Sequence, residues 1–163
     1  MRNIPLSTID SVARDVIALA TDYLPNVLLD SHKHRRAQFL YGATGLIEVS
    51  TEDGEWVIPP DSGVWIPENT AHETRMLNVS TRSLYIEPAA APRQGNRCEV
   101  LRVTPLLRQL LLEAVDVPLE YDLNGRDGSL MQLILHEVAR AEPLPFFAPI
   151  PRDESLAALC REF

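Results

Sequence analysis

Short runs of apolar and β-branched residues, separated by turn signals, dominate the first half of the chain. Each run covers four or five residues, and clusters such as Glu52-Asp53-Gly54 and Pro59-Pro60-Asp61 stand between them. Short strands at regular spacing with turns between them are typical of an antiparallel sandwich or barrel, so we predict a mainly β fold. The predicted strands are Val16 to Ala20, Gln38 to Tyr41, Leu46 to Ser50, Glu55 to Ile58, Gly63 to Ile66 and Arg82 to Ile86.

After Pro92 the apolar residues recur at helical spacing instead. Thr104 is a typical N-cap residue, and Pro105 suits the first turn of a helix because its missing N–H needs no partner there. The sequence therefore predicts a helix from Pro105 to Ala114. Its apolar stripe consists of Leu106, Leu107, Leu110, Leu111 and Ala114.

A second helix is predicted after a short loop. Asp127 or Ser129 could cap its first turn, and Pro143 ends it. Two helices of this size joined by a short loop form an antiparallel pair, which either covers the barrel or pairs with a second subunit. His136 lies beside the apolar stripe, so we expect a surface or interface position for it. The stripe itself consists of Leu130, Leu133, Ile134 and Val138.

The segment over residues 143–152 is dense in proline and predicts a semi-rigid spacer. Asp153 is a plausible N-cap for a further amphipathic helix over 153–163. A single short helix is marginal without a surface to pack on. It either folds back on the barrel or begins another domain, and we favour the second interpretation because a proline-rich spacer is a usual domain boundary.

Composition limits the classes of protein to consider. A chain of 163 residues suits one domain with a core, and its net charge of −8 argues against a direct grip on nucleic acid phosphates. No apolar run is long enough to span a bilayer, and Asp10, Arg14 and Asp15 interrupt what a secretory signal would need. Cys98 and Cys160 fit reduced thiols, so we expect a cytoplasmic protein.

Three of the four histidines fall in two short strand-like segments. His32 and His34 precede Gln38 in the first segment, and His72 stands in the second. Alternate residues of a strand face the same side, so the side chains of His32, His34 and Gln38 can point inward together. Neutral imidazole is a common metal ligand. The spacing leaves two alternatives open: a divalent-metal site, or histidines that hydrogen-bond to one another or line a metal-free pocket.

Other candidate effector-binding residues lie near these segments. Lys33 and Arg35 face away from the histidines by strand alternation, whereas Arg36 shares the inward parity and could meet an anionic ligand. Trp56 and Trp65 are the only tryptophans, and they either stack on an apolar effector or pack in the core. Further polar contacts without an assigned facing are Tyr41, Arg75 and Tyr85.

The order of motifs along the chain resembles the cupin half of AraC-type transcriptional regulators. The resemblance covers nearly all of residues 16–163 and begins with His32-x-His34 and Gln38. The motifs that continue it are Gly42, Gly45, Glu55-Trp56-Val57-Ile58-Pro59-Pro60, Trp65-Ile66-Pro67, His72, Arg82-Ser83-Leu84-Tyr85-Ile86, Cys98-Glu99-Val100-Leu101-Arg102-Val103, Thr104-Pro105-Leu106-Leu107-Arg108, Pro149-Ile150-Pro151-Arg152-Asp153 and Leu159-Cys160.

This resemblance implies a domain plan. Residues 1–97 would form a cupin jelly-roll barrel that binds an effector, and 98–142 an antiparallel helix pair for cover or dimerisation. Residues 143–152 would be the linker, and 153–163 the start of a truncated helix-turn-helix domain. DNA would be bound through that missing domain of a homodimer. Effector capture near the histidines would alter how the N-terminal segment and the helices pack, and so reset the spacing of the DNA-binding units.

The resemblance also implies a ligand set. Metal-binding cupins use two histidines separated by one residue, then a carboxylate, then a later histidine, which matches His32, His34 and His72. Gln38 stands where the carboxylate would be, and its amide oxygen is a neutral and weaker ligand. We expect zinc or nickel if the site holds a metal, because imidazole suits both.

The rival class is a free-standing metal-dependent cupin enzyme. A three-histidine site with open positions could serve a dioxygenase or an isomerase. The histidine segments offer no carboxylate general base except Glu73, whose parity opposes that of His72. The chain also contains no phosphate-binding loop and no dinucleotide-binding motif, so we predict that it is not an enzyme.

Overall fold

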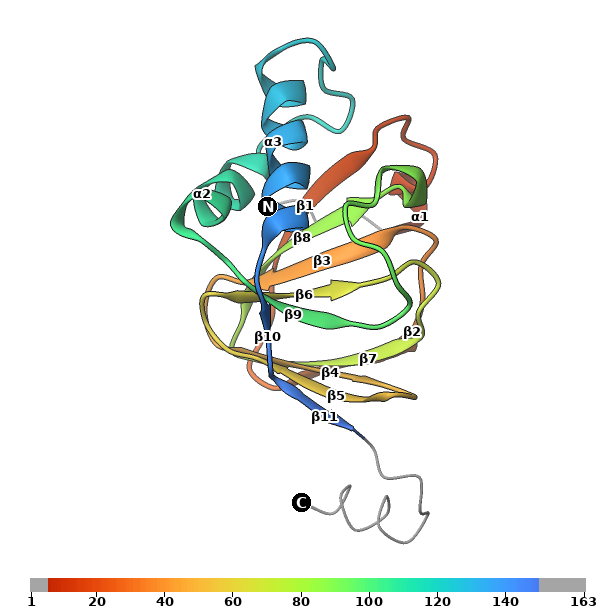
Figure 1. Ribbon diagram of the computed structural model, residues 1–163, viewed down its shortest axis with the longest axis vertical. Helices are drawn as coiled ribbons and strands as arrows, with labels where there is room; N and C mark the ends of the chain where they lie inside the picture. Colours follow the sequence, from red (N-terminus) through yellow and green to blue (C-terminus); the bar gives the residue numbers. More distant parts are fainter. Residues whose placement is uncertain (1–5, 150–163) are drawn as a thin grey trace, which may run out of the picture.

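Two antiparallel β-sheets face each other in a computed structural model that describes residues 6–149 (Figure 1). The six-stranded sheet has the order β1-β8-β3-β6-β9-β10, and the five-stranded sheet has the order β11-β5-β4-β7-β2. The elements are α1 (Leu6–Ile9), β1 (Val16–Asp22), β2 (Val27–His32), β3 (Ala37–Gly42), β4 (Leu46–Thr51), β5 (Gly54–Ile58), β6 (Ser62–Ile66), β7 (His72–Leu77), β8 (Ser80–Ile86), the 3₁₀ turn Pro88–Ala90, β9 (Glu99–Arg102), α2 (Pro105–Ala114), α3 (Arg126–Arg140), β10 (Pro143–Leu144) and β11 (Phe147–Pro149).

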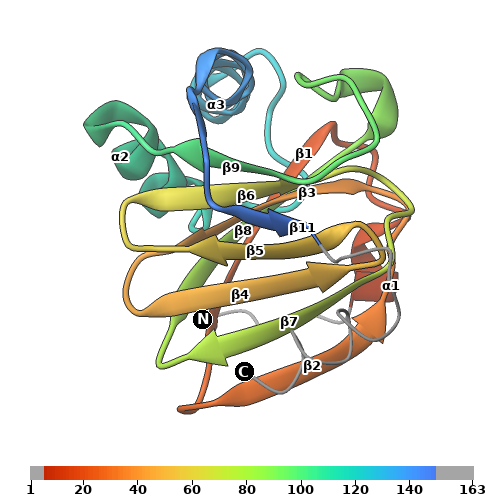
Figure 2. The same cartoon turned by 60° about the horizontal axis from the view of Figure 1, so that its bottom comes forward.

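The space between the sheets holds one hydrophobic cluster, which follows from the alternation of side chains along each strand. Leu40 of β3 and Val64 of β6 point into it from the six-stranded sheet, and Val49 and Met76 point into it from the other sheet. Figure 2 shows the two sheets stacked as layers. This arrangement confirms the predicted mainly β sandwich of jelly-roll type, with strands such as β5 alternating between buried and exposed positions.

The helix pair packs on the outer face of the six-stranded sheet. Phe39 and Trp65 of that sheet contact a second hydrophobic cluster that includes Leu111 of α2 and Ile134 of α3 (Figure 1). Both faces of β3 and β6 are therefore covered, which explains why every residue of these two strands is buried. Covering this sheet is one of the two roles that the apolar stripes predict.

The helix boundaries test the predicted caps. Thr104 caps α2, since its side chain accepts a hydrogen bond from the backbone N–H of Leu107. For α3 both predicted caps are wrong, because the helix begins at Arg126 with Gly125 as the N-cap residue. Asp127 lies in the first turn, where a carboxylate is favourable, and Ser129 donates its hydroxyl to a backbone carbonyl.

All six predicted strands are present, and the sequence missed β2, β7 and β9 as well as the short strands β10 and β11. Polar residues interrupt β2 and β7, and β9 has a charged residue at each end, so none of these three gives a strong strand pattern. Because β9 pairs with β6, the sheet continues past residue 97, where the barrel was expected to end. Among residues 6–149, no helix is long and apolar enough to cross a membrane.

Residues 143–149 form a strap across the sandwich rather than a free spacer. Its first strand, β10, pairs with β9 of the six-stranded sheet, and its second, β11, pairs with β5 of the other. Phe147 stacks on Trp56 with ring centroids 4.7 Å apart, and a Cβ at Gly54 would come within 2.5 Å of the Phe147 ring. Proline does not prevent this pairing because the strands lie at sheet edges. The rest of the predicted spacer and the helix over 153–163 lie outside the described residues.

Candidate functional site

The structure brings His32, His34 and His72 together at one end of the sandwich. The ring centroids of His32 and His72 lie 4.5 Å apart, those of His34 and His72 5.0 Å apart, and those of His32 and His34 5.6 Å apart. One ring nitrogen of each lies within 4.8 Å of the other two. His32 and His72 are register partners at the ends of β2 and β7.

The reason for this proximity differs from the predicted one. No single strand carries His32, His34 and Gln38 together, because β2 ends at His32 and β3 begins at Ala37. His34 lies in the connection between them, which carries the chain from one sheet to the other. The residues converge because this crossing folds over the end of the sandwich, and strand alternation plays no part in placing His34.

Each histidine ring is held by a backbone carbonyl two residues away. The Nδ1 atoms of His32, His34 and His72 donate to the carbonyl oxygens of Asp30, Arg36 and Thr70, at 2.7, 3.2 and 2.8 Å. A carbonyl can only accept, so each Nδ1 carries the proton and each neutral ring keeps a lone pair on Nε2. All three rings are thus in the tautomer that leaves Nε2 free to bind an ion.

Burial keeps two of these rings uncharged. It lowers the pKa of His72 from 6.5 to about 4, although the hydrogen bond to Thr70 opposes the shift. Burial also lowers the pKa of His34, although the hydrogen bond to the backbone of Arg36 opposes this shift. Neutral imidazole is the form that binds metals, so burial favours ligation over protonation at neutral pH.

His34 offers a direct test of whether an ion fits. Its Nε2 atom is fully buried and has no hydrogen-bond partner among the described residues. Leaving a buried acceptor without a partner costs free energy, and such groups in native proteins usually meet a water or an ion. The free Nε2 atoms of the three rings, with this orphaned one among them, fit a divalent cation that accepts imidazole.

Gln38 lies on β3 beside this histidine cluster. Its amide nitrogen donates to the hydroxyls of Ser83 and Tyr85, at 3.2 and 3.3 Å. The two hydroxyls thus hold the amide nitrogen, and the Gln38 side chain also contacts His34, where it opposes the lowering of the His34 pKa by burial. Gln38 is almost fully buried, and the Tyr85 ring packs edge-on against His34 at 5.4 Å.

A cavity of about 160 Å³ opens between the sheets next to the cluster. His32, His72 and Gln38 form part of its wall, and Leu6 of α1 closes another part. Burial raises the pKa of Tyr85, which keeps that hydroxyl protonated. The remaining lining residues come from β1, β2, β3, β7 and β8 and from Tyr23 just after β1: Leu19, Thr21, Tyr23, Leu29, Leu40, Thr74, Met76, Ser83 and Tyr85.

Sequence reasoning did not single out the small hydroxyl residues of this cavity. Ser83 and Thr74 are ordinary in composition, and only their inward position on β8 and β7 makes them relevant. The signal that could have found Ser83 is its even spacing from Tyr85, since residues two apart share a face. Nothing in the sequence indicated that Leu6 lines the cavity, because it reaches the cavity from α1, outside the two sheets.

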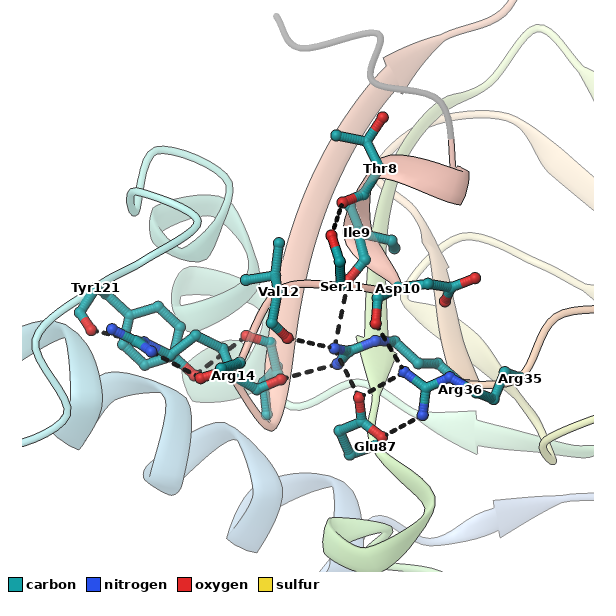
Figure 3. Close-up of polar contacts among 12 residues, drawn as sticks. Thr8, Ile9, Asp10, Ser11, Val12, Arg14, Arg35, Arg36, Glu87 and Tyr121 are labelled. Atoms are coloured by element: carbon teal, nitrogen blue, oxygen red, sulfur yellow. Dashed lines mark hydrogen bonds and ion pairs between the residues drawn. The ribbon is translucent and has the colours of Figure 1, made fainter.

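Arg36 does not face the cavity, contrary to its predicted role. Its fully buried guanidinium donates to the carbonyl oxygens of Val12 and Arg14, at 2.9 and 2.8 Å, and lies 2.7 Å from a carboxylate oxygen of Glu87 (Figure 3). It also reaches the carbonyl of Ile9 at 3.4 Å. Because β2 ends at His32 and β3 begins at Ala37, strand alternation does not decide which way the side chain of Arg36 faces. Arg36 instead holds residues 9–14 against the sandwich.

Neither tryptophan lines the cavity. Trp56 lies in the core between the sheets and under the strap, and Trp65 faces the helices on the other side of its sheet. Both therefore have the structural role that was the alternative to effector binding. Of the three unassigned polar residues, Tyr41 also faces the helices, Arg75 is exposed and pairs with Glu48 at 3.8 Å, and only Tyr85 lines the cavity. His136 is exposed, as expected.

The fold and this site define a class: a jelly-roll sandwich with a small internal cavity and a histidine group at its end, as in ligand-binding cupin-type domains. A family profile, the AraC-like ligand binding domain, matches residues 16–162. The chain belongs to this family.

Comparison with individual proteins agrees with the family. The chain is 27% identical over 120 residues to the HTH-type transcriptional regulator NimR of Escherichia coli K12, a match that covers 73% of this chain and 44% of NimR. In fold it resembles the AraC-like transcriptional activator CuxR, with a TM-score of 0.62, 10% identity, and coverage of 91% of this chain and 59% of that one. ToxT of Vibrio cholerae gives a TM-score of 0.55 at 10% identity, over 91% and 64% of the two chains. The chain thus spans less than two thirds of each relative.

Proposed function

We propose that this chain is the effector-sensing half of a longer transcriptional regulator, and that it binds a small molecule in the cavity beside His32, His34 and His72. The observation that supports this most directly is the cavity itself, which lies inside a domain of the AraC-like ligand-binding family. ToxT structures have been solved with an unsaturated fatty acid and with a naphthalenyl butenoic acid bound. Those ligands belong to ToxT, but they support a small-molecule effector for this fold.

A divalent metal is part of the proposal. The three Nε2 atoms and the amide oxygen of Gln38 would hold it, and a bound ion would supply a strong point of attachment for an electron-rich group of the effector. Zinc and nickel suit the imidazole ligands best. The chain's own residues would bind the ion and fix the ring tautomers through backbone carbonyls, and the buried His72 and Gln38 would limit the access of water.

Effector binding can change DNA affinity only if it favours one arrangement of the chain over another. The N-terminal segment, residues 6–15, provides a physical connection for this. It contributes Leu6 to the cavity wall, and Arg36 binds three of its carbonyls. Its Arg14 donates to the carbonyl of Tyr121 at 2.8 Å, in the loop between α2 and α3 (Figure 3). We propose that cavity occupancy is transmitted to the helix pair along this segment.

DNA binding and dimerisation belong to the same proposal. The net charge of −8 makes this chain a poor binder of phosphates, so a further helix-turn-helix domain would contact DNA in the cytoplasm. Leu106 of α2 and Leu133 of α3 are 49% and 40% exposed, which supports a homodimer through the helix pair. The rival function of a free-standing enzyme has less support, because the matching family is a ligand-binding domain of regulators.

The proposed function can be tested with the full-length natural gene and a reporter fused to its own upstream region. A screen of small molecules would identify one that changes expression. His34→Ala should then abolish most of the response while protein level and DNA binding stay near those of the wild type. His136→Ala is the matched control, because this histidine is exposed and lies away from the cluster. An unchanged response in His34→Ala would contradict the proposed site.

A further inference from the structure

Among the described residues, neither the histidines His32, His34 and His72 nor the cavity lining beside them supplies a carboxylate, and the nearest acidic influence is the charge of Asp10 acting on His34 from outside the cavity. None of the described residues that line the cavity is an aspartate, glutamate, lysine or arginine. Gln38 is neutral at the position where metal-binding cupins carry a carboxylate. The three Nδ1 atoms donate to backbone carbonyls, so no carboxylate stands behind the rings either. Neither the ligands nor the groups that orient them can balance the charge of a divalent ion.

A dication held by neutral ligands keeps its full charge. Gln38 and His72 are buried and His32 and His34 are half-buried, so little water reaches the ion, and an uncompensated charge in such a place is costly. The cost disappears when an anion becomes the next ligand, because the two charges then neutralise each other where water is scarce. Long-range attraction does not draw anions to this chain, since its net charge is −8. Selectivity for an anionic ligand would therefore come from the bound metal ion.

The cavity limits the size of that anion. Its volume of about 160 Å³ is close to that of apolar protein cavities that admit one benzene molecule, at roughly 150 Å³. Leu19, Leu29, Leu40 and Met76 offer an apolar wall to the body of the ligand. A ligand with one ring or a short chain, charged at one end and apolar at the other, matches both the volume and the lining.

We propose that the effector is a small organic monocarboxylate, of about the size of benzoate, whose carboxylate binds a divalent metal held by His32, His34, His72 and Gln38. This inference rests on the proposed function, because it requires the metal. It gives Gln38 the role of the residue that sets specificity. Ser83 and Tyr85 hold its amide nitrogen, so the metal meets a neutral oxygen and still needs an anionic partner.

The test uses the purified full chain loaded with Co²⁺, whose visible absorption reports on its ligands. Benzoate is compared with benzamide, a neutral molecule of nearly the same shape, by calorimetry and by the cobalt spectrum. We expect benzoate to change the spectrum and to bind at least about ten-fold more tightly than benzamide. We also expect benzoate affinity to fall at least about ten-fold when the metal is removed with a chelator.

Gln38→Glu provides the matched variant, because it changes the charge but hardly the shape. The hydroxyls of Ser83 and Tyr85, which accept from the amide nitrogen of Gln38, can rotate and donate to the carboxylate instead. It should bind Co²⁺ more tightly than the wild type and lose most of its preference for benzoate over benzamide. If this variant fails to fold, the comparison of benzoate with benzamide in the wild type still decides the matter. His136→Ala should behave as the wild type in every assay.

The outcomes separate this inference from the proposed function. Wild-type protein that binds Co²⁺ but takes benzamide as well as benzoate would overturn the anion inference and leave the metal site standing. Benzoate binding that is equally tight without metal would also overturn it. A cobalt spectrum unchanged from that of the free ion would contradict the metal in the proposed function, and the anion inference with it, while a metal-free sensor would remain open to the reporter assay.

Discussion

Arg35 and Arg36 are adjacent in sequence and both contact Glu87, yet their surroundings differ greatly. Arg35 is an exposed partner at 2.6 Å, whereas the Arg36 side chain is 1% exposed and also binds three backbone carbonyls. Burial lowers the pKa of Arg36, but a guanidinium remains charged at neutral pH. Removal of Arg36 would therefore leave three backbone carbonyls at buried or part-buried positions without their donor, whereas removal of Arg35 would leave Glu87 paired with Arg36 and accessible to water.

We predict that Arg36→Met lowers the free energy of unfolding by about 3 kcal/mol, because the carbonyls of Ile9, Val12 and Arg14 lose their donor and the buried side of the ion pair with Glu87 is removed. The matched change Arg35→Met should cost under about 1 kcal/mol, as exposed ion pairs do. Urea unfolding followed by circular dichroism measures both values. Equal losses in the two variants would show that burial of Arg36 has no energetic weight.

The buried His72 gives the metal-free protein a pH dependence. Its pKa is about 4 in the folded chain and 6.5 in the unfolded chain, so the unfolded chain takes up the proton first as pH falls. Stability from this residue is present above about pH 6.5, declines towards pH 4, and is then fully lost. The total loss is at most about 3 kcal/mol.

We predict that His72→Gln flattens the stability profile between pH 7 and pH 4.5 relative to the wild type, both treated with a chelator. Thermal unfolding at several pH values measures how the stability of each protein depends on pH. Parallel profiles for the wild type and His72→Gln would refute the prediction.

At the scale of elements, the strap over residues 143–149 connects the two sheets at the point where the chain leaves the sandwich. Phe146 and Phe147 are both 41% exposed, but only Phe147 stacks on Trp56. We predict that Phe147→Ala weakens the strap by about 1 kcal/mol, the usual worth of an aromatic pair beyond its buried area. The pairing of β11 with β5 should open more often, with little change in global stability.

Hydrogen exchange read by mass spectrometry would show this as faster exchange in peptides that contain residues 54–58 and 143–149. Phe146→Ala is the matched control, equal in exposure and one residue away, and it should change exchange much less. If both variants exchange at the wild-type rate, the aromatic stack does not hold the strap in place.

At the scale of the whole molecule, the helix pair presents exposed leucines away from the sheet. We predict that Leu106→Glu and Leu133→Glu together convert a dimer into a monomer at micromolar concentration, because charged residues are disfavoured at an interface core. Light scattering coupled to size exclusion measures the mass. Leu24→Glu, at a position that is 77% exposed in the turn between β1 and β2, should leave the dimer intact. A monomeric wild type would contradict dimerisation through this domain.

Much of the architecture was predictable because it depends on local patterns. Alternation and turn residues were sufficient for six strands, and helical spacing with Thr104 was sufficient for α2. The strap was not predictable, because prolines at 143 and 145 argue locally against a strand and only the two open sheet edges make pairing favourable. The cap of α3 failed for a similar reason, since Gly125 has no side chain to mark it.

The sequence by itself determined the types of side chain that the site contains and the order of the elements that carry them. His32, His34, Gln38 and His72 could be selected because their chemistry and spacing are visible in one dimension. Which side each residue faces was decided by the tertiary structure: Arg36 turned to the N-terminal segment, Trp65 to the helices, and Ser83 and Leu6 to the cavity. The physical reason is that facing depends on where the chain crosses from one sheet to the other, and those crossings are fixed by packing between distant segments.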